Sequence, residues 1–215
     1  MSEAIQVLLV DDHTLVRQGI AALVSRQADI EIVGECGNGL EVVRRVLEAE
    51  PDVVVLDITL PGLNGLDVCR QITRKSKNSA VLILTMHADE EHVVRAFKSG
   101  ATGYLLKEAA AEQFTEAVRA VASGELYLGA GIPSTVLKRL GEEGEEDSYS
   151  LLTDRERQVL QQIAEGLTNR QVAENLGVST KTVDTHRTRL MRKLGIHNQT
   201  MLVKYAYQRG IVKLD

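Results

Sequence analysis

Tryptophan is absent from this sequence of 215 residues and aromatic residues make up only 3% of it, so a hydrophobic core must be built from aliphatic side chains. No apolar run is long enough to cross a bilayer, and the N-terminal residues MSEAIQ lack the basic-then-apolar pattern of a signal peptide. These two absences predict a cytoplasmic protein with no membrane association.

Cysteine is also scarce. Cys36 and Cys69 fall in different predicted elements and have neither CxxC spacing nor companion histidines. This pattern favours reduced cysteines that pack in a core over a disulfide or a zinc site.

The net charge of −5 conceals an uneven distribution along the chain. Residues 1–147 hold 14 Lys and Arg against 24 Asp and Glu, a net charge of −10, whereas residues 148–215 hold 11 against 6, a net charge of +5. The chain is also longer than the commonest domain size. We therefore expect two domains with different partners, and a polyanion as the partner of the second.

Five short apolar runs occupy the acidic part of the chain, and each is followed by a segment with apolar residues at helical spacing. The runs are IQVLLV, IEIVG, VVVLD, AVLILT and GYLLK, and the segments are TLVRQGIAALVSR, LEVVRRVLEAE, LDVCRQIT, EEHVVRAFKSG and AEQFTEAVRAVASG. Strands that alternate with helices favour a parallel sheet with right-handed crossovers. The pattern predicts a doubly wound (βα)5 domain of the α/β class.

The basic part follows GEEGEED, residues 141–147, which has no apolar residue and is predicted to be a solvated linker. Four helical segments come after it. TDRE, from Thr153, and TNRQ, from Thr168, both fit the capping box that marks a helix start. The helix in NRQVAENL stops at the next glycine, and the following helix begins at Ser179 or Thr180. A short helix, a glycine-containing turn and a longer basic helix indicate a helix-turn-helix.

Polar residues end four of the five predicted strands: Asp11 and Asp12 the first, Asp57 the third, Thr85 the fourth and Lys107 the fifth. Because functional groups of a doubly wound sheet gather at the carboxyl ends of its strands, these side chains are expected at one rim. Neighbouring carboxylates repel each other unless one is protonated or a hard cation such as Mg²⁺ binds between them. With a lysine and a hydroxyl beside them, such a rim can receive a phosphoryl group on a carboxylate.

Each of these residues also has a simpler explanation when taken alone. Asp12 could cap the helix that begins near Thr14, the other strand-end Asp and Thr residues could act as caps too, and Lys107 could extend into solvent. The joint occurrence of all five at strand ends favours the phosphoryl site.

The stretch from Leu8 to Gly124, including LLVDDH and LPGLNGLD, resembles the receiver domain of two-component response regulators, which has a flavodoxin-like fold. The resemblance implies that a sensor histidine kinase phosphorylates Asp57 and that Mg²⁺ is the cofactor. It assigns Mg²⁺ to Asp11, Asp12, Asp57 and the backbone of Thr59, the phosphate contact to Lys107, and the switch to Thr85 and Tyr104.

One residue departs from the receiver pattern. Many receivers follow the lysine with a proline in a cis peptide, whereas Glu108 stands here. A cis peptide is very unfavourable for a residue other than proline, so the loop before Ala109 is predicted to be trans.

The longer basic helix, from Thr180 to Leu194, has two distinct faces. Val183, Leu190 and Leu194 share one face, whereas Lys181, Thr185, Thr188 and Arg192 lie nearly opposite, with Asp184 and Arg189 beside them. A basic helix that is merely solvated is one interpretation. The capped helix and the turn that precede it favour a DNA-reading helix.

The string LTDRERQVLQQIAEGLTNRQVAENLGVSTKTVDTHRTRLMRKLGI resembles the four-helix DNA-binding domain of the LuxR type. A receiver joined to this domain gives the NarL/FixJ class of response regulators, and the third helix would then enter the major groove of promoter DNA. Base-edge contacts are expected from Asp184, Thr185 and Thr188, and phosphate contacts from Lys181, Thr182, His186, Arg189 and Lys193. Arg192 is also expected to bind DNA. Asp184 could instead repel phosphate, and His186 could equally be a packing residue.

The last helical segment, QTMLVKYAYQRG, places Met201, Leu202 and Tyr205 at helical spacing. Core packing explains some of these residues, and the LuxR resemblance implies that this helix also forms a homodimer interface, in the phosphorylated or DNA-bound state.

We therefore predict a receiver domain at residues 1–124, a linker with a possible short helix at 125–150, and a LuxR-type helix-turn-helix domain at 151–215. The predicted function is phosphorylation-dependent transcription regulation, with RNA polymerase as a possible further partner, rather than enzymatic activity. Two alternatives are a phosphotransfer module with a protein-binding output domain and an aspartyl-phosphate hydrolase. The hydrolase would need a general acid two residues after the nucleophile, where Thr59 stands.

Overall fold

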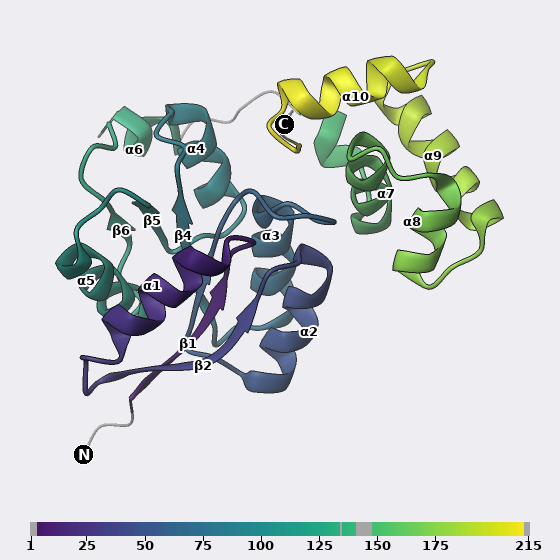
Figure 1. Cartoon of the computed structure of the whole chain (residues 1–215). Coiled ribbons are helices and arrows are strands. Elements are labelled where there is room, and N and C mark those ends of the chain that lie inside the picture. Colours follow the sequence, from purple (N-terminus) through teal and green to yellow (C-terminus); the bar gives the residue numbers. More distant parts are fainter. Residues whose placement is uncertain (1–3, 134, 141–147, 213–215) are drawn as a thin grey trace. The chain divides into compact units, whose positions relative to one another are not determined.

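The computed structural model describes residues 4–133, 135–140 and 148–212, which form two compact units (Figure 1). The first unit holds a sheet and the second is helical. This arrangement confirms the predicted order of an α/β domain followed by an all-α domain. The predicted linker GEEGEED, residues 141–147, lies outside the described residues.

The first unit is built on a parallel sheet in the order β2-β1-β3-β4-β5-β6. Its strands are β1 (Ile5–Val10), β2 (Ile30–Cys36), β3 (Val53–Leu56), β4 (Ala80–Thr85), β5 (Gly103–Leu106) and β6 (Tyr127–Leu128). The five predicted strands are confirmed. β6 was not predicted, because two residues are too few to show the alternation by which a strand is recognised.

Helices cover both faces of the sheet, as a doubly wound fold requires (Figure 1). They are α1 (Thr14–Val24) and α5 (Ala111–Ala122) on one face, and α2 (Gly39–Ala49), α3 (Gly65–Lys75) and α4 (Glu90–Lys98) on the other. Phe114 and Val118 of α5 pack with Val24 of α1 against Leu9 and Val55 of the central strands. This core is almost wholly aliphatic, as the composition predicts.

The chain continues after the sheet into α6 (Thr135–Leu140), which lies beside α4 (Figure 1). Arg139 of α6 forms an ion pair with Glu90 at the start of α4, at 3.3 Å. The short helix that the sequence left open for this region is therefore present.

The second unit consists of the 3₁₀ helix η1 (Ser148–Leu151) and four α-helices. The α-helices are α7 (Asp154–Ala164), α8 (Asn169–Leu176), α9 (Thr180–Leu194) and α10 (Gln199–Gln208). Both predicted capping boxes are present, since Thr153 and Thr168 accept the amides of Glu156 and Gln171 at 3.3 and 3.4 Å. Gly177 ends α8 at φ 63°, a left-handed conformation that glycine adopts without a Cβ clash.

Three smaller predictions can be compared with the described residues. Cys36 and Cys69 are both buried free thiols, in agreement with a packing role. The described part of the chain contains no cis peptide, so the loop at Glu108 is trans. None of the described helices has both the length and the hydropathy needed to cross a bilayer.

Candidate functional site

The strand-end residues of the first unit meet at one rim of the sheet, as the sequence predicts. β1 runs directly into Asp11, β3 into Asp57, β4 ends on Thr85 and β5 is followed by Lys107. Asp11, Asp57 and Thr85 are only 3%, 4% and 1% exposed. Two buried carboxylates within one pocket need a cation beside them, because a buried charge is costly unless it is paired.

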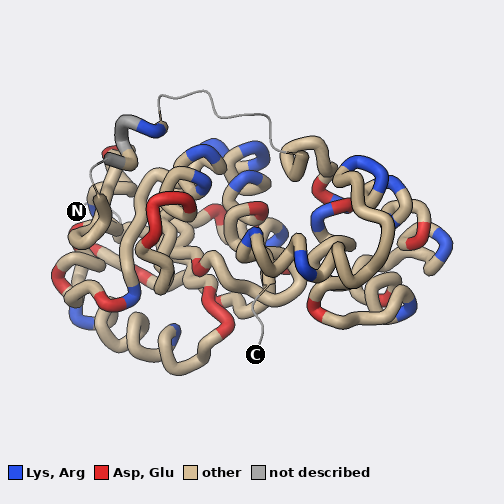
Figure 2. Tube along the Cα trace, turned by 90° about the horizontal axis from the view of Figure 1, so that it is seen from above, with Lys and Arg blue, Asp and Glu red and all other residues tan. Residues whose placement is uncertain are grey.

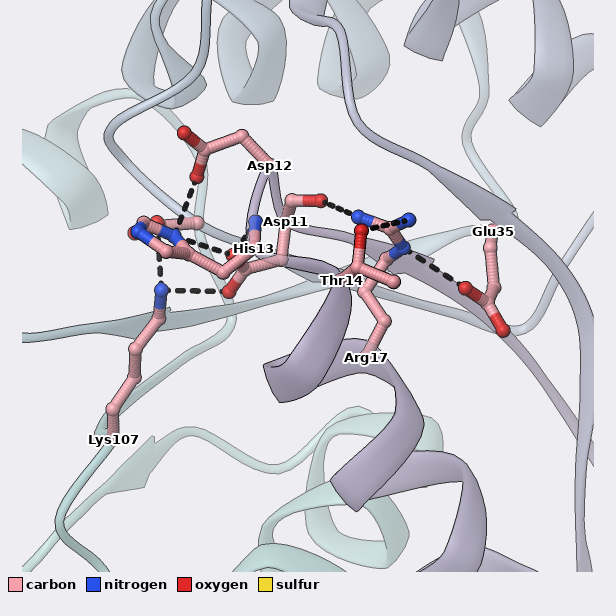
Figure 3. A network of polar contacts seen from close by, with 8 residues as sticks. Asp11, Asp12, His13, Thr14, Arg17, Glu35 and Lys107 are labelled. Carbon is pink, nitrogen blue, oxygen red and sulfur yellow. Dashed lines mark hydrogen bonds and ion pairs between the residues drawn. The ribbon is translucent and has the colours of Figure 1, made fainter.

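Lys107 supplies that cation in the present structure (Figure 3). Its Nζ lies 2.6 Å from Oδ2 of Asp11 and 2.8 Å from Oδ2 of Asp57. Burial raises the pKa of Asp57 above its ordinary value, although the hydrogen bond and the charge of Lys107 act in the opposite direction. Burial lowers the pKa of Lys107, but its two carboxylate partners outweigh this and raise it overall. The lysine is therefore held as an ammonium between two carboxylates that belong to different strands.

Asp12 lies at the open side of the pocket, and its side chain is 35% exposed. It does not cap α1, whose N-cap residue is His13 with no side-chain capping bond. The simpler explanation of Asp12 as a helix cap is therefore wrong. Its Oδ1 instead lies 2.7 Å from Nδ1 of His13.

His13 was not among the predicted site residues, although it joins the cluster directly (Figure 3). Its backbone amide donates to Oδ1 of Asp11 at 2.8 Å, and its Nδ1 lies 3.2 Å from the same oxygen. Arg17 was missed as well. Its Nη1 donates to the Asp11 carbonyl oxygen at 2.6 Å, and its Nε donates to Glu35 at 2.9 Å. These contacts fix the backbone at the end of β1 and thereby orient Asp11.

The donor atoms of this pocket suit a hard divalent cation. One ligand atom from each of Asp11, Asp12, His13 and Asp57 can be chosen so that all lie within 4.8 Å of one another. Oδ2 of Asp11 is buried, and its partner is the Lys107 ammonium, a cation that a metal ion could replace. Mg²⁺ prefers one or two carboxylates completed by waters and phosphate oxygens, so the carboxylate set fits this ion.

Thr85 and Tyr104, the predicted switch residues, both contact the backbone of His87. Tyr104 is 0% exposed, and its hydroxyl donates to the carbonyl oxygen of His87 at 2.8 Å. The amide of His87 in turn donates to Oγ1 of Thr85 at 3.4 Å. One loop residue therefore links the threonine at the pocket to the tyrosine on β5.

The second unit presents the helix-turn-helix geometry that the sequence indicates. Ser179 caps α9 by accepting the amide of Thr182 at 3.1 Å, and Val183 and Leu190 are fully buried against the unit's core. α9 holds five Lys and Arg residues. Figure 2 marks every described Lys and Arg of the chain in blue. The exposed residues among those predicted to meet DNA are Lys181, Asp184, Thr185, Thr188, Arg189 and Arg192.

Contacts made by some of these residues add detail that the helical pattern lacks. Oδ1 of Asp184 accepts a hydrogen bond from Asn169 of α8, and the hydroxyl of Thr188 donates to the Asp184 carbonyl oxygen at 2.9 Å. Nζ of Lys193 lies 2.6 Å from the Glu156 carboxylate, and it also donates to the Leu151 carbonyl oxygen. Lys193 is thus engaged in the packing of α9 against α7, and His186 is half-buried.

The hydrophobic residues of α10 divide into two groups. Leu202 is fully buried and belongs to the core of the unit. Met201 and Tyr207 are 53% and 49% exposed. The exposed stripe that remains available for a second copy therefore excludes Leu202.

Comparison with known proteins agrees with both halves of this geometry. Residues 7–119 match the response regulator receiver domain family, and residues 150–206 match the bacterial regulatory proteins of the luxR family. The chain belongs to the response regulators of the NarL/FixJ class, in which a receiver domain is followed by a LuxR-type DNA-binding domain. It is thus a transcriptional regulator of the two-component type.

Similar individual proteins span nearly the same length. The transcriptional regulatory protein LiaR of Bacillus subtilis is 38% identical, over 97% of this chain and 99% of its own. The oxygen regulatory protein NreC of Staphylococcus epidermidis is 36% identical over the same shares. Among solved structures, the response regulator ChrA of a heme-sensing two-component system aligns with a TM-score of 0.54 and 33% identity, covering 98% of this chain and all of ChrA.

Proposed function

We propose that Asp57 is the residue that receives the phosphoryl group, from a sensor histidine kinase. The observation that carries this proposal is the ion pair of Lys107 with both Asp57 and Asp11 inside one rim. In the transfer, an oxygen of the Asp57 carboxylate attacks phosphorus, and the bond from phosphorus to the donor's leaving group breaks. Lys107 can then move from the carboxylate to a phosphoryl oxygen, where its charge is again paired.

Asp11, Asp12 and Asp57, with the backbone carbonyl of Thr59, are the residues we propose to hold Mg²⁺. The cluster of ligand atoms and the burial of Asp11 and Asp57 support this set. When bound, the ion neutralises charge on the transferring group. His13 and Arg17 are proposed to position the Asp11 side chain and backbone through the contacts described above.

Thr85 and Tyr104 are proposed to transmit the change. A phosphoryl group on Asp57 can accept a hydrogen bond from the Thr85 hydroxyl, which would draw that residue away from the His87 amide. The carbonyl oxygen of His87 also accepts the Tyr104 hydroxyl, so a movement of Thr85 and a movement of Tyr104 are connected through one loop. The shift is a change in the populations of two receiver conformations.

The basic unit is proposed to bind promoter DNA through α9, as a homodimer that uses the exposed part of α10. The carrying observation is the exposed set Lys181, Thr185, Thr188, Arg189 and Arg192 on a helix whose opposite face is buried. Thr182 and His186 are proposed at the edge of the contact, and Lys193 is proposed to stay with Glu156. We propose Asp184 as a base-edge acceptor that Asn169 orients.

We retain the boundaries 1–124, 125–150 and 151–215 for the receiver, the linker and the DNA-binding domain. We also propose the cytoplasm as location, since promoter DNA is transcribed there, and RNA polymerase as a further partner. Turnover of a small phosphate substrate is not proposed, because Thr59 is a poor general acid.

The phosphoacceptor is tested by labelling with acetyl phosphate and Mg²⁺. We expect Asp57→Asn to take up no label, while Asp52→Asn, a matched change at an exposed position, is labelled like the parent. Circular dichroism of each variant checks the fold. Equal labelling of Asp57→Asn and the parent would show that the phosphoryl group goes elsewhere.

The proposed DNA binding of the basic unit is tested by measuring the affinity of the protein for duplex DNA at several salt concentrations. Binding through several phosphates makes the logarithm of affinity fall linearly with the logarithm of salt concentration. If the basic unit bound only protein, duplex affinity would be absent at every salt concentration. That result would favour the phosphotransfer module with a protein-binding output.

A further inference from the structure

We propose that His87, Asp89 and His92 form a binding site for a divalent transition-metal ion of the Zn²⁺ type, separate from the acidic pocket. His87 and Asp89 lie in the loop between β4 and α4, and His92 lies in the first turn of α4. One ligand atom of each residue can be chosen so that all three lie within 4.8 Å of one another. The proposed function uses the loop backbone here but gives these side chains no role.

The first argument is the arrangement of the three side chains. The imidazole rings of His87 and His92 are stacked, with their centroids 4.2 Å apart and their planes 8° from parallel. Both carboxylate oxygens of Asp89 lie 2.8 Å from Nδ1 of His92. Two imidazoles and one carboxylate are among the donor sets of zinc, and imidazole ligands favour Zn, Cu and Ni over Mg and Ca.

The second argument is an unpartnered nitrogen. The His92 side chain is 16% exposed, and its Nε2 is buried without a hydrogen-bond partner within the described residues. A buried polar atom in this condition normally costs free energy, so its presence needs an explanation. A metal ion is one partner that an imidazole nitrogen can take, after a rotation of the ring.

Helix capping accounts for only part of this cluster. Asp89 is the N-cap residue of α4, and its Oδ1 accepts the amide of His92 at 3.1 Å. Capping uses Oδ1, whereas Oδ2 lies 2.8 Å from Nδ1 of His92. It explains neither the stacking of His87 on His92 nor the buried nitrogen.

Hydrogen bonds hold the backbone of His87, and metal binding requires at least one imidazole ring to rotate, because the in-plane lone pairs of two stacked rings do not converge on one ion. His87 is fixed at its carbonyl by Tyr104 and at its amide by Thr85. Tetrahedral ligands at zinc distances of about 2.0–2.1 Å lie roughly 3.3 Å from one another. Asp89 and His92, now 2.8 Å apart, would therefore separate slightly. Three protein ligands leave a fourth position for water or for another ligand.

A bound ion would tie the loop of His87 to the first turn of α4. This consequence rests on the proposed function, in which the same loop connects Thr85 with Tyr104. If phosphorylation moves the loop, then phosphorylation changes the affinity for the metal, and the metal changes the equilibrium constant of phosphorylation by the same factor. The direction expected is antagonism, because the ion would hold the loop in its present position.

The site is tested by titrating the full-length protein with Co²⁺, whose visible absorption reports nitrogen ligands and low coordination number. A large excess of Mg²⁺ is present throughout to occupy the acidic pocket. We expect one ion per chain, displaced by Zn²⁺. His87→Gln and His92→Gln should each weaken binding at least tenfold, the smallest loss usually seen when even an outer-shell partner of a metal is removed.

Two further variants separate ligation from other roles. Asp89→Asn keeps a good N-cap residue but loses the carboxylate, so its melting temperature should match the parent's while Co²⁺ binding weakens at least tenfold. His13→Gln changes the acidic pocket and should leave Co²⁺ affinity within twofold of the parent's value. Unchanged affinity in His92→Gln, weakened affinity in His13→Gln, or no Co²⁺ binding by the parent would each overturn the proposal. The titration needs neither phosphorylation nor DNA, so its failure would leave the proposed function intact.

Discussion

Replacement of Lys107 by methionine removes the cation between Asp11 and Asp57 while leaving a side chain of similar length. The two carboxylate side chains are 5% and 4% exposed, so solvent cannot take over the role of the ammonium. We expect the receiver domain of Lys107→Met to unfold more readily than that of the parent at pH 7 in the absence of Mg²⁺.

The size of the effect follows from the geometry. At 2.6 and 2.8 Å, each ion pair contributes about 6 kcal/mol of gross attraction if the effective dielectric constant is about 20. Desolvation of the three groups offsets much of this attraction, so the net loss is smaller. Removal of one partner from a buried pair typically costs about 3–5 kcal/mol. At roughly 3 °C per kcal/mol for a domain of this size, the melting temperature should fall by about 9–15 °C.

Acidification should recover part of the loss. The pKa of Asp57 is raised in the folded protein, so the folded state binds more protons than the unfolded state between the two pKa values. The free energy of unfolding therefore increases as the pH falls through the pKa of Asp57 in the folded protein toward its ordinary value in the unfolded chain. Lys107→Met removes the two effects of the lysine that lower this pKa, so the gain between pH 7 and about 5 should be larger in the variant than in the parent.

Calorimetry of the full chain provides the measurement, with and without Mg²⁺. The transition that responds to Mg²⁺ belongs to the receiver domain, and saturating Mg²⁺ should stabilise the variant more than the parent, because the ion replaces the missing cation. Lys77→Met, at an exposed position, is the control and should stay within about 0.5 kcal/mol of the parent. If both variants melted alike, the assignment of Lys107 as the cation of a buried triad would be wrong.

Four other changes test separate features. Gly65→Ala should reduce acetyl phosphate labelling strongly, because a Cβ there would collide with the backbone of Asp57; normal labelling would contradict this. Thr153→Ala should destabilise the helical unit by about 1 kcal/mol in chemical unfolding through loss of the capping box, and no change would argue against the cap. Arg189→Ala should weaken binding to all DNA sequences and reduce the salt slope by about 1, whereas Thr188→Ala should change preference at one base pair per half-site by ~1–3 kcal/mol. A selected motif that Thr188→Ala leaves unaltered would place this face of α9 away from the bases.

The rim of the sheet was predictable because its residues end apolar runs. Asp57 and Lys107 each close a strand that is continuously apolar, and strand ends of a parallel sheet share one edge whatever the loops do. The helix starts at Thr153 and Thr168 were predictable for a similar reason. Capping is a local interaction between residues three positions apart, so a short string of sequence contains all of it.

Contacts between elements distant in sequence were not predictable. Arg17 has the spacing of an ordinary solvent-facing cation on an amphipathic helix, and only the pairing of β1 with β2 brings Glu35 to it. Lys193 similarly appeared to belong to the basic face of its helix. A helical wheel shows the direction of a side chain but not the acidic residue of another helix, here Glu156, that lies in that direction.

The parallel sheet also determines when the proposed phosphorylation site comes into existence. Lys107 and Asp57 are 50 positions apart, and the strands that carry them are separated in the sheet by β4. Such nonlocal pairings form late and slowly in folding, because long loops must close before the contacts are gained. A nascent or truncated chain that ends before β5 has Asp57 but lacks its lysine. Under the proposed function, competence for phosphorylation would therefore mark a completed receiver, and incomplete chains would not draw phosphoryl groups away from finished molecules.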